Sequence, residues 1–326
     1  MTSHASRLRI GVPASLSGKH ARFGGQVRIG LEVWQSLDPS VELVVEDDHS
    51  EPGSLDVVLP RLAGQCDLLL GPYSTQLMRR AGRIGAALDR LIWNHGGSGD
   101  DVQAANPGYV VSVQTPAGRY AEPFVRHLAE SGDLSPLRIV CGKGRFALQV
   151  AEGAARAAHE VGIPVVLGGL VDDSWNLFCA GSFDEDVEVV RRAHRPRVVC
   201  AVAAGVREFG ASVGDPIGIY GVGQWFPGGG GEVALGVSEA EFVAAYERRT
   251  GVPPNYLAVQ GVAAAIIATH CAVRAGGTGR EELWSAAAGL ETATLFGDFA
   301  IDPGTGRQTR HRAVLTRWEE QGPVSV

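Results

Sequence analysis

Residues 67–76 constrain the fold more than any other part of the sequence. A short apolar run, Leu68–Leu70, stops at a Gly-Pro pair, and Tyr73, Ser74 and Thr75 follow it. Apolar residues then recur at helical spacing, so the segment predicts a buried strand, a tight turn and a helix. Such a turn directs backbone N–H groups and hydroxyls into one crevice, which suits a carboxylate or another polar group. The same residues also fit a plain helix cap.

The N-terminal third repeats this alternation of strand and helix. Strands are predicted over 8–12 and 41–45, with a helix over 23–37 between them. This order is typical of a doubly wound parallel sheet, in which ligands bind beyond the carboxyl ends of the strands. The residues that follow such ends are Ser17, Phe23, Tyr73, Ser74 and Thr75.

The remaining chain predicts a second α/β unit, further helices and a terminal β pair. Residues 114–118 are interpreted as a crossing into the second unit, which follows short strands over 91–93 and 109–113. In that unit, helices are predicted over 119–131, 147–161 and 185–193, and strands over 137–141, 164–168, 197–202 and 217–220. Helices over Glu239–Thr250, Tyr256–Ala275 and 280–289 come next, and a strand over 313–318 lies near the end.

Composition excludes several classes of protein. The chain has 326 residues, enough for two domains, and its 45% hydrophobic and 20% charged residues are typical of a globular protein. A net charge of −7 argues against binding to nucleic acid or to an anionic membrane. No run of 18 to 20 apolar residues predicts a membrane span. Arg7 and Arg9 interrupt the only early apolar stretch, so we expect a cytoplasmic chain as written, or an extracytoplasmic one if an export segment has been removed.

The cysteines and acidic residues give no metal-binding pattern. Five widely spaced cysteines are expected to be small buried residues, with Cys141 and Cys200 at the ends of buried strands. Asp47 and Asp48 end a strand and are interpreted as a solvated turn that caps the next segment. We therefore expect no metal site and no cofactor.

Several motifs together resemble the type I periplasmic binding proteins, in the branch of leucine/isoleucine/valine-binding and amide-sensing receptors. The matching segments are residues 10–18 with 23–24, 44–52, 70–75, 106–110 and 296–304. The resemblance implies two lobes that close on a small ligand, with crossings near 114–118, 228–233 and 291–295. Lobe 1 is then expected to comprise 1–116 and 234–292, and lobe 2 to comprise 117–233 and 293–326.

The resemblance also implies positions for ligand contacts. The residue at Thr75 holds the ligand carboxylate in amino-acid binders of the family. The loop with Gly96, Gly97 and Ser98 matches the segment that holds the ligand's ammonium and carboxylate groups. Phe23 and Phe146 fall where aromatic residues line the two lobes.

One position departs from the family pattern and leaves the ligand open. Gln224 lies near the place of an acidic residue that pairs the ammonium, and a neutral amide is a poor partner for a desolvated ammonium. An amino acid, an amide, a urea-like solute and an aromatic carboxylate all remain possible ligands. His95 is expected to donate a hydrogen bond or to stack, rather than to act as a base. Trp225 is expected either to cover the ligand or to pack.

The only notable enzyme motif is G-x-G-x-x-A over residues 142–147, between a predicted strand and helix. It resembles a dinucleotide-binding loop, but the nearest acidic candidates, Asp172 and Asp173, come about ten residues too late. Residues 96–100 miss the serine-hydrolase elbow by one position. We therefore predict no catalytic residues.

The sequence thus predicts a protein that binds a small polar solute between two lobes. An ABC transporter permease or a regulatory protein is expected to recognise the conformation in which the lobes have closed. An NAD(P)-dependent dehydrogenase that uses Gly142 to Ala147 is one alternative, and a cytoplasmic sensor of amides or ureas is another.

Overall fold

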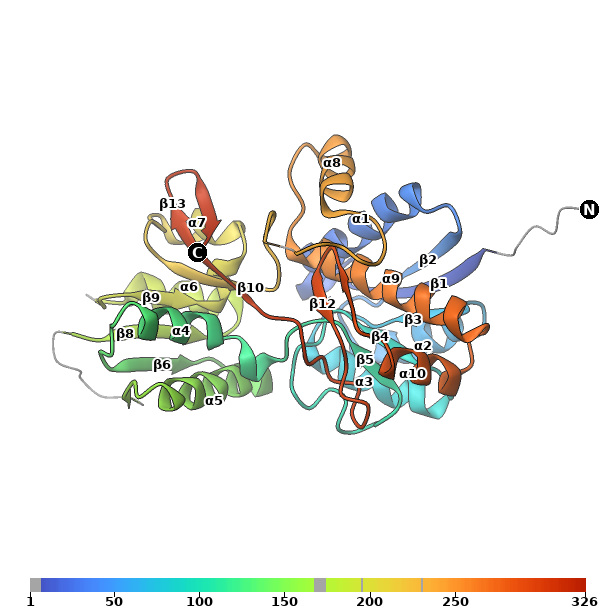
Figure 1. Ribbon diagram of the computed structural model, residues 1–326, viewed down its shortest axis with the longest axis horizontal. Coiled ribbons are helices and arrows are strands. Elements are labelled where there is room, and N and C mark those ends of the chain that lie inside the picture. The colour runs from blue at the N-terminus through green and yellow to red at the C-terminus, as the bar shows by residue number, and fades with distance from the viewer. Residues whose placement is uncertain (1–6, 167–173, 195, 230) are drawn as a thin grey trace, which may run out of the picture. The chain divides into compact units, whose positions relative to one another are not determined.

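The computed structural model describes residues 7–166, 174–194, 196–229 and 231–326. The chain divides into two compact units, each of which is discontinuous in sequence. Unit 1 comprises Met1–Gln114 and Gly230–His311, and unit 2 comprises Thr115–Gly229 and Arg312–Val326. The chain therefore passes between the units three times (Figure 1).

A parallel sheet forms the centre of unit 1. In the described residues its five strands run in the order β2-β1-β3-β4-β5. Their bounds are Leu8–Ala14 for β1, Val41–Asp47 for β2, Leu68–Leu70 for β3, Ile92–Asn94 for β4 and Val110–Ser112 for β5. The chain winds outward from β1 to one side and from β3 to the other. The carboxyl ends of β1 and β3 thus lie at the switch point, where doubly wound sheets bind ligands.

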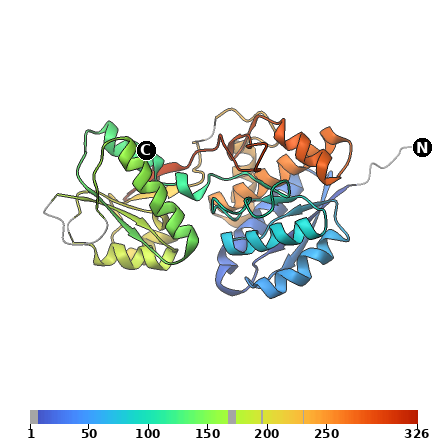
Figure 2. The same ribbon diagram turned by 90° about the horizontal axis from the view of Figure 1, so that it is seen from below.

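Helices pack around the sheet of unit 1. They are α1 (Ala21–Leu37), α2 (Pro52–Ala63), α3 (Thr75–Ala87), α8 (Glu239–Thr250), α9 (Tyr256–Ala275) and α10 (Arg280–Ala288). Helices α2 and α3 pack together and share an apolar core with β3 and β4, in which Leu55, Leu77 and Ile92 are fully buried. Figure 2 shows these two helices, in light blue and cyan, side by side.

Helix α9 is long and apolar enough to cross a membrane by length and composition, and 78% of its best window is buried within the protein. It packs against α1 and α10 and touches β3 and β4. Residues 257–268 are all buried, which explains why this part of the helix is apolar all round.

The third passage between the units differs from the expected place. Strand β11 (Thr292–Thr294) pairs antiparallel with β12 (Gly297–Phe299), and this hairpin belongs to unit 1. The backbone carbonyl of Ala293 accepts hydrogen bonds from the amides of Ala234 and Leu235 in the same unit. Residues 293–311 therefore lie in unit 1, and the chain leaves it after His311 rather than near 291–295.

A mixed sheet forms the centre of unit 2. Within the described residues its strands run in the order β14-β13-β10-β9-β8-β6-β7. The parallel strands are β6 (Leu137–Cys141), β7 (Val165–Val166), β8 (Asn176–Ala180), β9 (Val199–Ala201) and β10 (Tyr220–Gly223). Strands β13 (Val314–Glu319) and β14 (Gly322–Ser325) add an antiparallel edge. The terminal strands therefore complete the sheet of unit 2.

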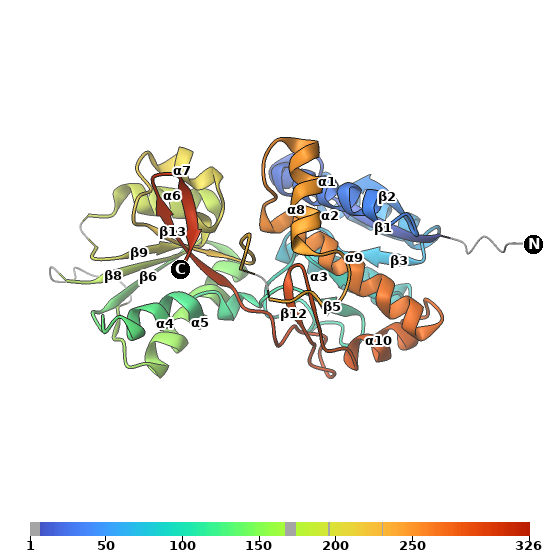
Figure 3. The same ribbon diagram turned by 45° about the horizontal axis from the view of Figure 1, so that its top comes forward.

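The sheet of unit 2 has an apolar core on each face. Helices α4 (Glu122–Glu130) and α5 (Gly144–Glu160) cover one face, around Phe124 and Phe178. Helices α6 (Phe183–Arg192) and α7 (Glu208–Val213) cover the other, around Phe209 and Trp318. Figure 3 shows α4 and α5 in green on one side of the strands, and α6 and α7 in yellow on the other.

Several predicted elements differ from those observed. Helix α2 and strand β8 were not predicted. Strand β10 begins at Tyr220, where the predicted strand over 217–220 ends. The predicted strand over 164–168 reaches only Val166 as β7, and its last residues lie outside the described residues. Four cysteines are buried as expected, but Cys141 is exposed because β6 ends there at the sheet edge.

Candidate functional site

The turn after β3 is both a helix cap and part of a wider surface. Ser74 is the N-cap of α3, and its Oγ accepts a 3.3 Å hydrogen bond from the amide of Leu77. Its φ of +89° lies in a region that residues other than glycine rarely adopt. A strained backbone at a helix start is a common feature of ligand sites, although strain alone does not identify one.

The loop after β4 packs directly against this turn. The amide of Ser74 donates to the carbonyl of Gly96 at 3.0 Å, and Thr75 Oγ1 accepts from the amide of Gly99 at 3.1 Å. A Cβ at Gly96 would lie 2.6 Å from the carbonyl oxygen of Pro72, so this position requires glycine. Gly97 is buried against α3, and Ser98 is half-buried. The turn at residues 73–75 and the loop at residues 95–98 therefore lie next to each other, as parts of one surface.

Asn94, which was not predicted as a site residue, holds this loop in shape. Its Oδ1 accepts from the amides of Gly96 and Gly97, and its Nδ2 donates to the carbonyl of Gly97 and to Ser112 Oγ, both at 2.7 Å. Gln103 also donates to Ser112 Oγ. An asparagine followed two residues later by a pair of glycines fits such a side-chain-to-backbone turn.

His95 is buried beneath the loop, with 2% of its surface exposed. Burial lowers the pKa of His95 to about 4, against a smaller opposing effect of the Gly71 backbone. The imidazole is therefore neutral at physiological pH, and it offers a hydrogen bond or a stacking face rather than a positive charge.

Aromatic side chains form a cluster beside the turn. The rings of Phe23 and Tyr73 lie 4.6 Å apart between centroids, and His20 packs edge-on to Tyr73 at 5.5 Å. The guanidinium of Arg22 lies 4.5 Å from the centroid of Phe23. Burial, Lys19 and Arg22 together lower the pKa of His20 to about 4, so this ring is also neutral. His20 and Arg22 were not predicted, because their type and spacing match no motif.

Ser17 is engaged with the turn after β2. Its Oγ lies 2.8 Å from His49 Nδ1, and its carbonyl accepts a hydrogen bond from Ser50 Oγ. The neighbouring Asp48 is fully buried and accepts from Ser15 Oγ at 2.7 Å and from the amide of Ser50 at 2.8 Å. The interpretation of 47–48 as a solvated turn is therefore wrong for Asp48, because its carboxyl group ties the loop after β1 to the loop after β2.

In unit 2, Phe146 lies in the first turn of α5 and packs edge-on to Tyr120, with centroids 5.7 Å apart. Gln224 follows β10 and is 3% exposed. Its Oε1 accepts from the amide of Thr115, and its Nε2 donates to the carbonyl of Thr115 and to the hydroxyl of Tyr120. Both amide hydrogens of Gln224 are thus already used inside the unit. Trp225 is buried, and its indole N–H has no hydrogen-bond partner among the described residues.

The turn between β6 and α5 is occupied by a carboxylate. Glu185 Oε1 accepts from the amide of Lys143 at 2.9 Å, and a Cβ at Gly142 would lie 2.5 Å from Glu185 Oε2. A dinucleotide phosphate at this helix start would meet a negative charge at close range. No group of metal-ligating side chains occurs among the described residues.

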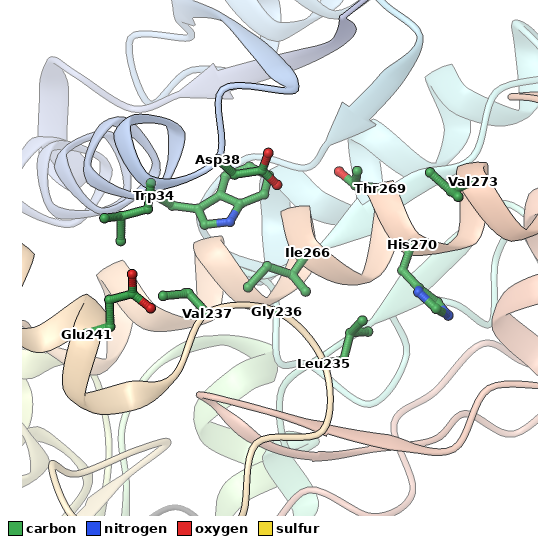
Figure 4. A pocket seen from close by; sticks show the side chains of 11 residues that line it. Trp34, Asp38, Leu235, Gly236, Val237, Glu241, Ile266, Thr269, His270 and Val273 are labelled. Atoms are coloured by element: carbon green, nitrogen blue, oxygen red, sulfur yellow. The ribbon is translucent and has the colours of Figure 1, made fainter. Parts of the chain in front are cut away.

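Unit 1 also has a groove away from these residues, with a volume of about 370 Å³ (Figure 4). It lies between the end of α1, the segment 235–237 and α9, with Trp34, Ile266 and Val273 among its lining residues. None of the predicted site residues lines it.

The arrangement of strands and helices is that of the type I periplasmic binding fold, as the resemblance indicated. No family model matches the chain, and no curated protein matches it. A leucine-binding protein from Thermotoga maritima is similar in structure with a TM-score of 0.81 and 16% identity, over 98% of this chain and 97% of that one.

Two further solved structures are similar over nearly their whole length. A solute-binding protein of an ABC transporter from Rhodopseudomonas palustris, in complex with 3,4-dihydroxybenzoic acid, has a TM-score of 0.80 and 14% identity, over 98% of this chain and 95% of that one. A substrate-binding protein from Desulfitobacterium hafniense, in complex with Leu, has a TM-score of 0.81 and 15% identity, over 98% of this chain and 100% of that one.

Proposed function

We propose that this chain is a non-catalytic solute-binding protein, whose two units together hold one small ligand. The observation that carries the proposal is the surface formed by the aromatic pair Phe23 and Tyr73 and by the two loops joined through Ser74 and Gly96. An apolar wall beside a few fixed donors is the usual composition of a small-molecule site. This surface lies at the carboxyl ends of β1, β3 and β4, where the fold binds ligands.

The surface of unit 1 suits a carboxylate attached to an apolar or aromatic body. The start of α3 provides a partial positive charge near Thr75, and the Phe23 and Tyr73 rings provide a flat apolar face. His95 is neutral, so the carboxylate would be held by hydrogen bonds rather than by an imidazolium. Amides and urea-like solutes use the same donors.

Unit 2 is proposed to supply Phe146 and Trp225 to the same ligand. Phe146 offers an aromatic edge, and the indole N–H of Trp225 is a donor whose partner would be the ligand. Gln224 is neutral and hydrogen-bonded to Thr115 and Tyr120, which favours a ligand without a free ammonium. The 3,4-dihydroxybenzoic acid bound by the Rhodopseudomonas palustris protein has no ammonium group, whereas the leucine bound by the Desulfitobacterium hafniense protein has one.

Closure of the units on the ligand is proposed as the output of binding. A ligand shifts such an equilibrium only by its differential affinity for the closed state. An ABC transporter permease is the proposed reader, because the Rhodopseudomonas palustris neighbour is a solute-binding protein of such a transporter. A regulatory protein that senses an amide is the second candidate, and the ligand screen below separates the two ligand classes.

A ligand screen tests the proposal. Thermal unfolding is measured with leucine, isoleucine, benzoate, 4-hydroxybenzoate, acetamide and urea, and hits are confirmed by calorimetry. A ligand at 100 times its Kd stabilises the native state by about 2.7 kcal/mol. We expect 1:1 binding of at least one compound, lost in Tyr73→Ala and retained in Tyr109→Ala, because Tyr109 packs against Arg280 and not against this surface. Binding that survives Tyr73→Ala unchanged would contradict the proposed site.

A further inference from the structure

The first passage between the units is held on both sides by side-chain amides. Val113 and Gln114 end unit 1, and Thr115 begins unit 2. The carbonyl of Val113 accepts a hydrogen bond from Gln308, and the peptide of Thr115 is paired with Gln224. Between these two anchors stands Gln114, whose side-chain amide finds no hydrogen-bond partner among the described residues.

The anchor in unit 2 resembles a strand pairing. Gln224 Oε1 accepts from the amide of Thr115 at 2.9 Å, and Gln224 Nε2 donates to the carbonyl of Thr115 at 3.2 Å. A side-chain amide thus makes the two bonds that a neighbouring strand would make. Gly223, directly before Gln224, pairs with Val314, where the third passage enters β13. One end of β10 therefore anchors the first and the third passages together.

The anchor in unit 1 is also a glutamine whose side-chain amide makes several hydrogen bonds to the backbone. Gln308 is 2% exposed, and its Nε2 donates to the carbonyl of Val113 at 2.9 Å. Its Oε1 accepts from the amides of Ala300, Thr309 and Arg310 at 2.9–3.2 Å. Gln308 thus fixes the end of the first passage to the segment that leads to the third one.

The third passage is also short. His311 is buried, stacks on Phe296 with centroids 4.2 Å apart, and lies 3.0 Å from the carbonyl of Phe296 through Nε2. Val314 is already paired in the sheet of unit 2. Only Arg312 and Ala313 lie between these two fixed points.

We propose that Gln224 and Gln308 are positioning residues which confine bending of the first passage to Gln114. They replace a flexible linker by a joint with a defined axis. A joint of this kind lowers the number of open conformations, so less entropy is lost when the units close on a ligand. The inference rests on the proposed closure, but its test uses no ligand.

Gln224 also connects the first passage to Phe146, one of the proposed ligand contacts. The hydroxyl of Tyr120 accepts a hydrogen bond from Gln224 Nε2, and the Tyr120 ring packs on Phe146. A displacement of Phe146 by a ligand would therefore reach the peptide of Thr115 through two intervening residues, Tyr120 and Gln224.

Three variants and a control test the proposal. Gln224→Met and Gln308→Met keep side-chain length and remove every hydrogen bond. Gln224→Glu keeps an acceptor for the Thr115 amide and removes the donor to its carbonyl. Gln65→Met is the control, since the Gln65 side chain is exposed and, among the described residues, makes a single 3.4 Å hydrogen bond, to Glu46.

Two measurements are made on the ligand-free protein. Hydrogen exchange of the Thr115 amide reports the anchor, and residual dipolar couplings, fitted separately for each unit, report how freely the units move. We expect exchange of Thr115 to accelerate by roughly two- to tenfold in Gln224→Met, the range of one lost hydrogen bond, and to remain slow in Gln224→Glu and Gln65→Met. We expect the alignment magnitude of unit 2 to fall relative to that of unit 1 in both Gln→Met anchor variants.

The outcomes are decisive without a ligand. Unchanged couplings in both anchor variants, with each unit still folded, would overturn the proposal even if Thr115 exchange accelerates. Gln308→Met removes the acceptor of three backbone amides. If this variant does not fold, the couplings of Gln224→Met alone decide whether the proposal holds. A negative ligand screen with changed couplings would refute the proposed function and leave the joint standing.

Discussion

The backbone amide of Ser74 donates a 3.0 Å hydrogen bond to the carbonyl of Gly96. This bond joins the turn after β3 to the loop after β4, which are 22 residues apart in sequence and neighbours at one sheet edge. Thr75 Oγ1 also accepts from the amide of Gly99, so two hydrogen bonds hold the two loops together. The surface proposed to hold the ligand is therefore preformed in unit 1, and preformed sites bind with a smaller entropic cost.

Gly96→Ala is expected to separate these loops. The new Cβ would lie 2.6 Å from Pro72 O and 2.7 Å from Tyr73 Cα, both of which are backbone atoms that cannot rotate away. We expect a loss of about 1–3 kcal/mol of stability, the range of overpacking, and loss of ligand binding. Chemical unfolding and calorimetry measure the two effects. Gly53→Ala in α2 is the control, because its Cβ would meet nothing within 4 Å. Equal behaviour of the two variants would contradict the close approach.

The sheet, the turn and the aromatic wall could be predicted because local patterns encode them. Runs such as Leu68–Leu70 specify buried strands, and parallel strands bring their carboxyl ends to one edge. Helix α2 was not predicted because it contains two prolines, Pro52 and Pro60, and proline inside a segment normally indicates that it is not helical. The place of the third passage depends on the hydrogen bond from Ala234 to Ala293, which joins distant residues and leaves no local signal. The role of Asn94 does have a local signal, the glycine pair Gly96-Gly97 two residues further on.

A buried carboxyl group makes the stability of unit 2 pH-dependent. Asp186 is 1% exposed, and burial raises its pKa to about 7, although the amide of Ala203 donates to it at 2.9 Å. The native state then binds more protons than the unfolded state between pH 3.8, the ordinary pKa, and about 7. Its contribution to stability is present below pH 3.8 and is lost as the pH rises through about 7.

Asp186→Asn is therefore expected to remove a fall in stability with rising pH. The variant keeps an acceptor for the Ala203 amide and cannot ionise. His20 and His95 act in the opposite direction, because their pKa values of about 4 in the native state lie below 6.5. The decisive quantity is thus the difference in unfolding free energy between wild type and variant from pH 4 to 8. A difference that stays constant over this range would show that Asp186 does not titrate there.

Binding at the surface of unit 1 is expected to be independent of the protonation of His95. Its native pKa of about 4 keeps the ring neutral from pH 5.5 to 8, where an exposed histidine would lose a proton. Calorimetric Kd values for a carboxylate ligand should therefore agree within about twofold over this range. A tenfold weakening centred near pH 6.5 would instead indicate an imidazolium that pairs with the ligand.

The chain is expected not to bind NAD(H). The carboxylate of Glu185 accepts from the amide of Lys143 and fills the space beside Gly142, where a phosphate would have to lie. Calorimetry with NAD⁺ and NADH measures this directly, and Glu185→Gln serves as the control that removes the charge. Stoichiometric, tight binding by the wild type would restore the dehydrogenase alternative and overturn the proposed function.

Substitutions at Thr75 test whether residues 73–75 bind the ligand or only cap α3. They also test whether the ligand carries a carboxylate or a neutral amide. If the ligand carries a carboxylate at the start of α3, Thr75→Ala removes a hydrogen bond to a charged group, worth about 1.5–3 kcal/mol, and loosens Gly99. We expect Kd to rise by about tenfold or more, with the fold intact. Thr75→Asp should weaken binding further, because two negative groups would share one desolvated surface. A neutral amide responds differently: Thr75→Ala costs less, and Thr75→Asp is tolerated. Calorimetry on both variants decides between the two ligand classes. Unchanged affinity in both variants, for the ligand identified in the screen, would show that residues 73–75 only cap α3, and the central inference about this surface would be wrong.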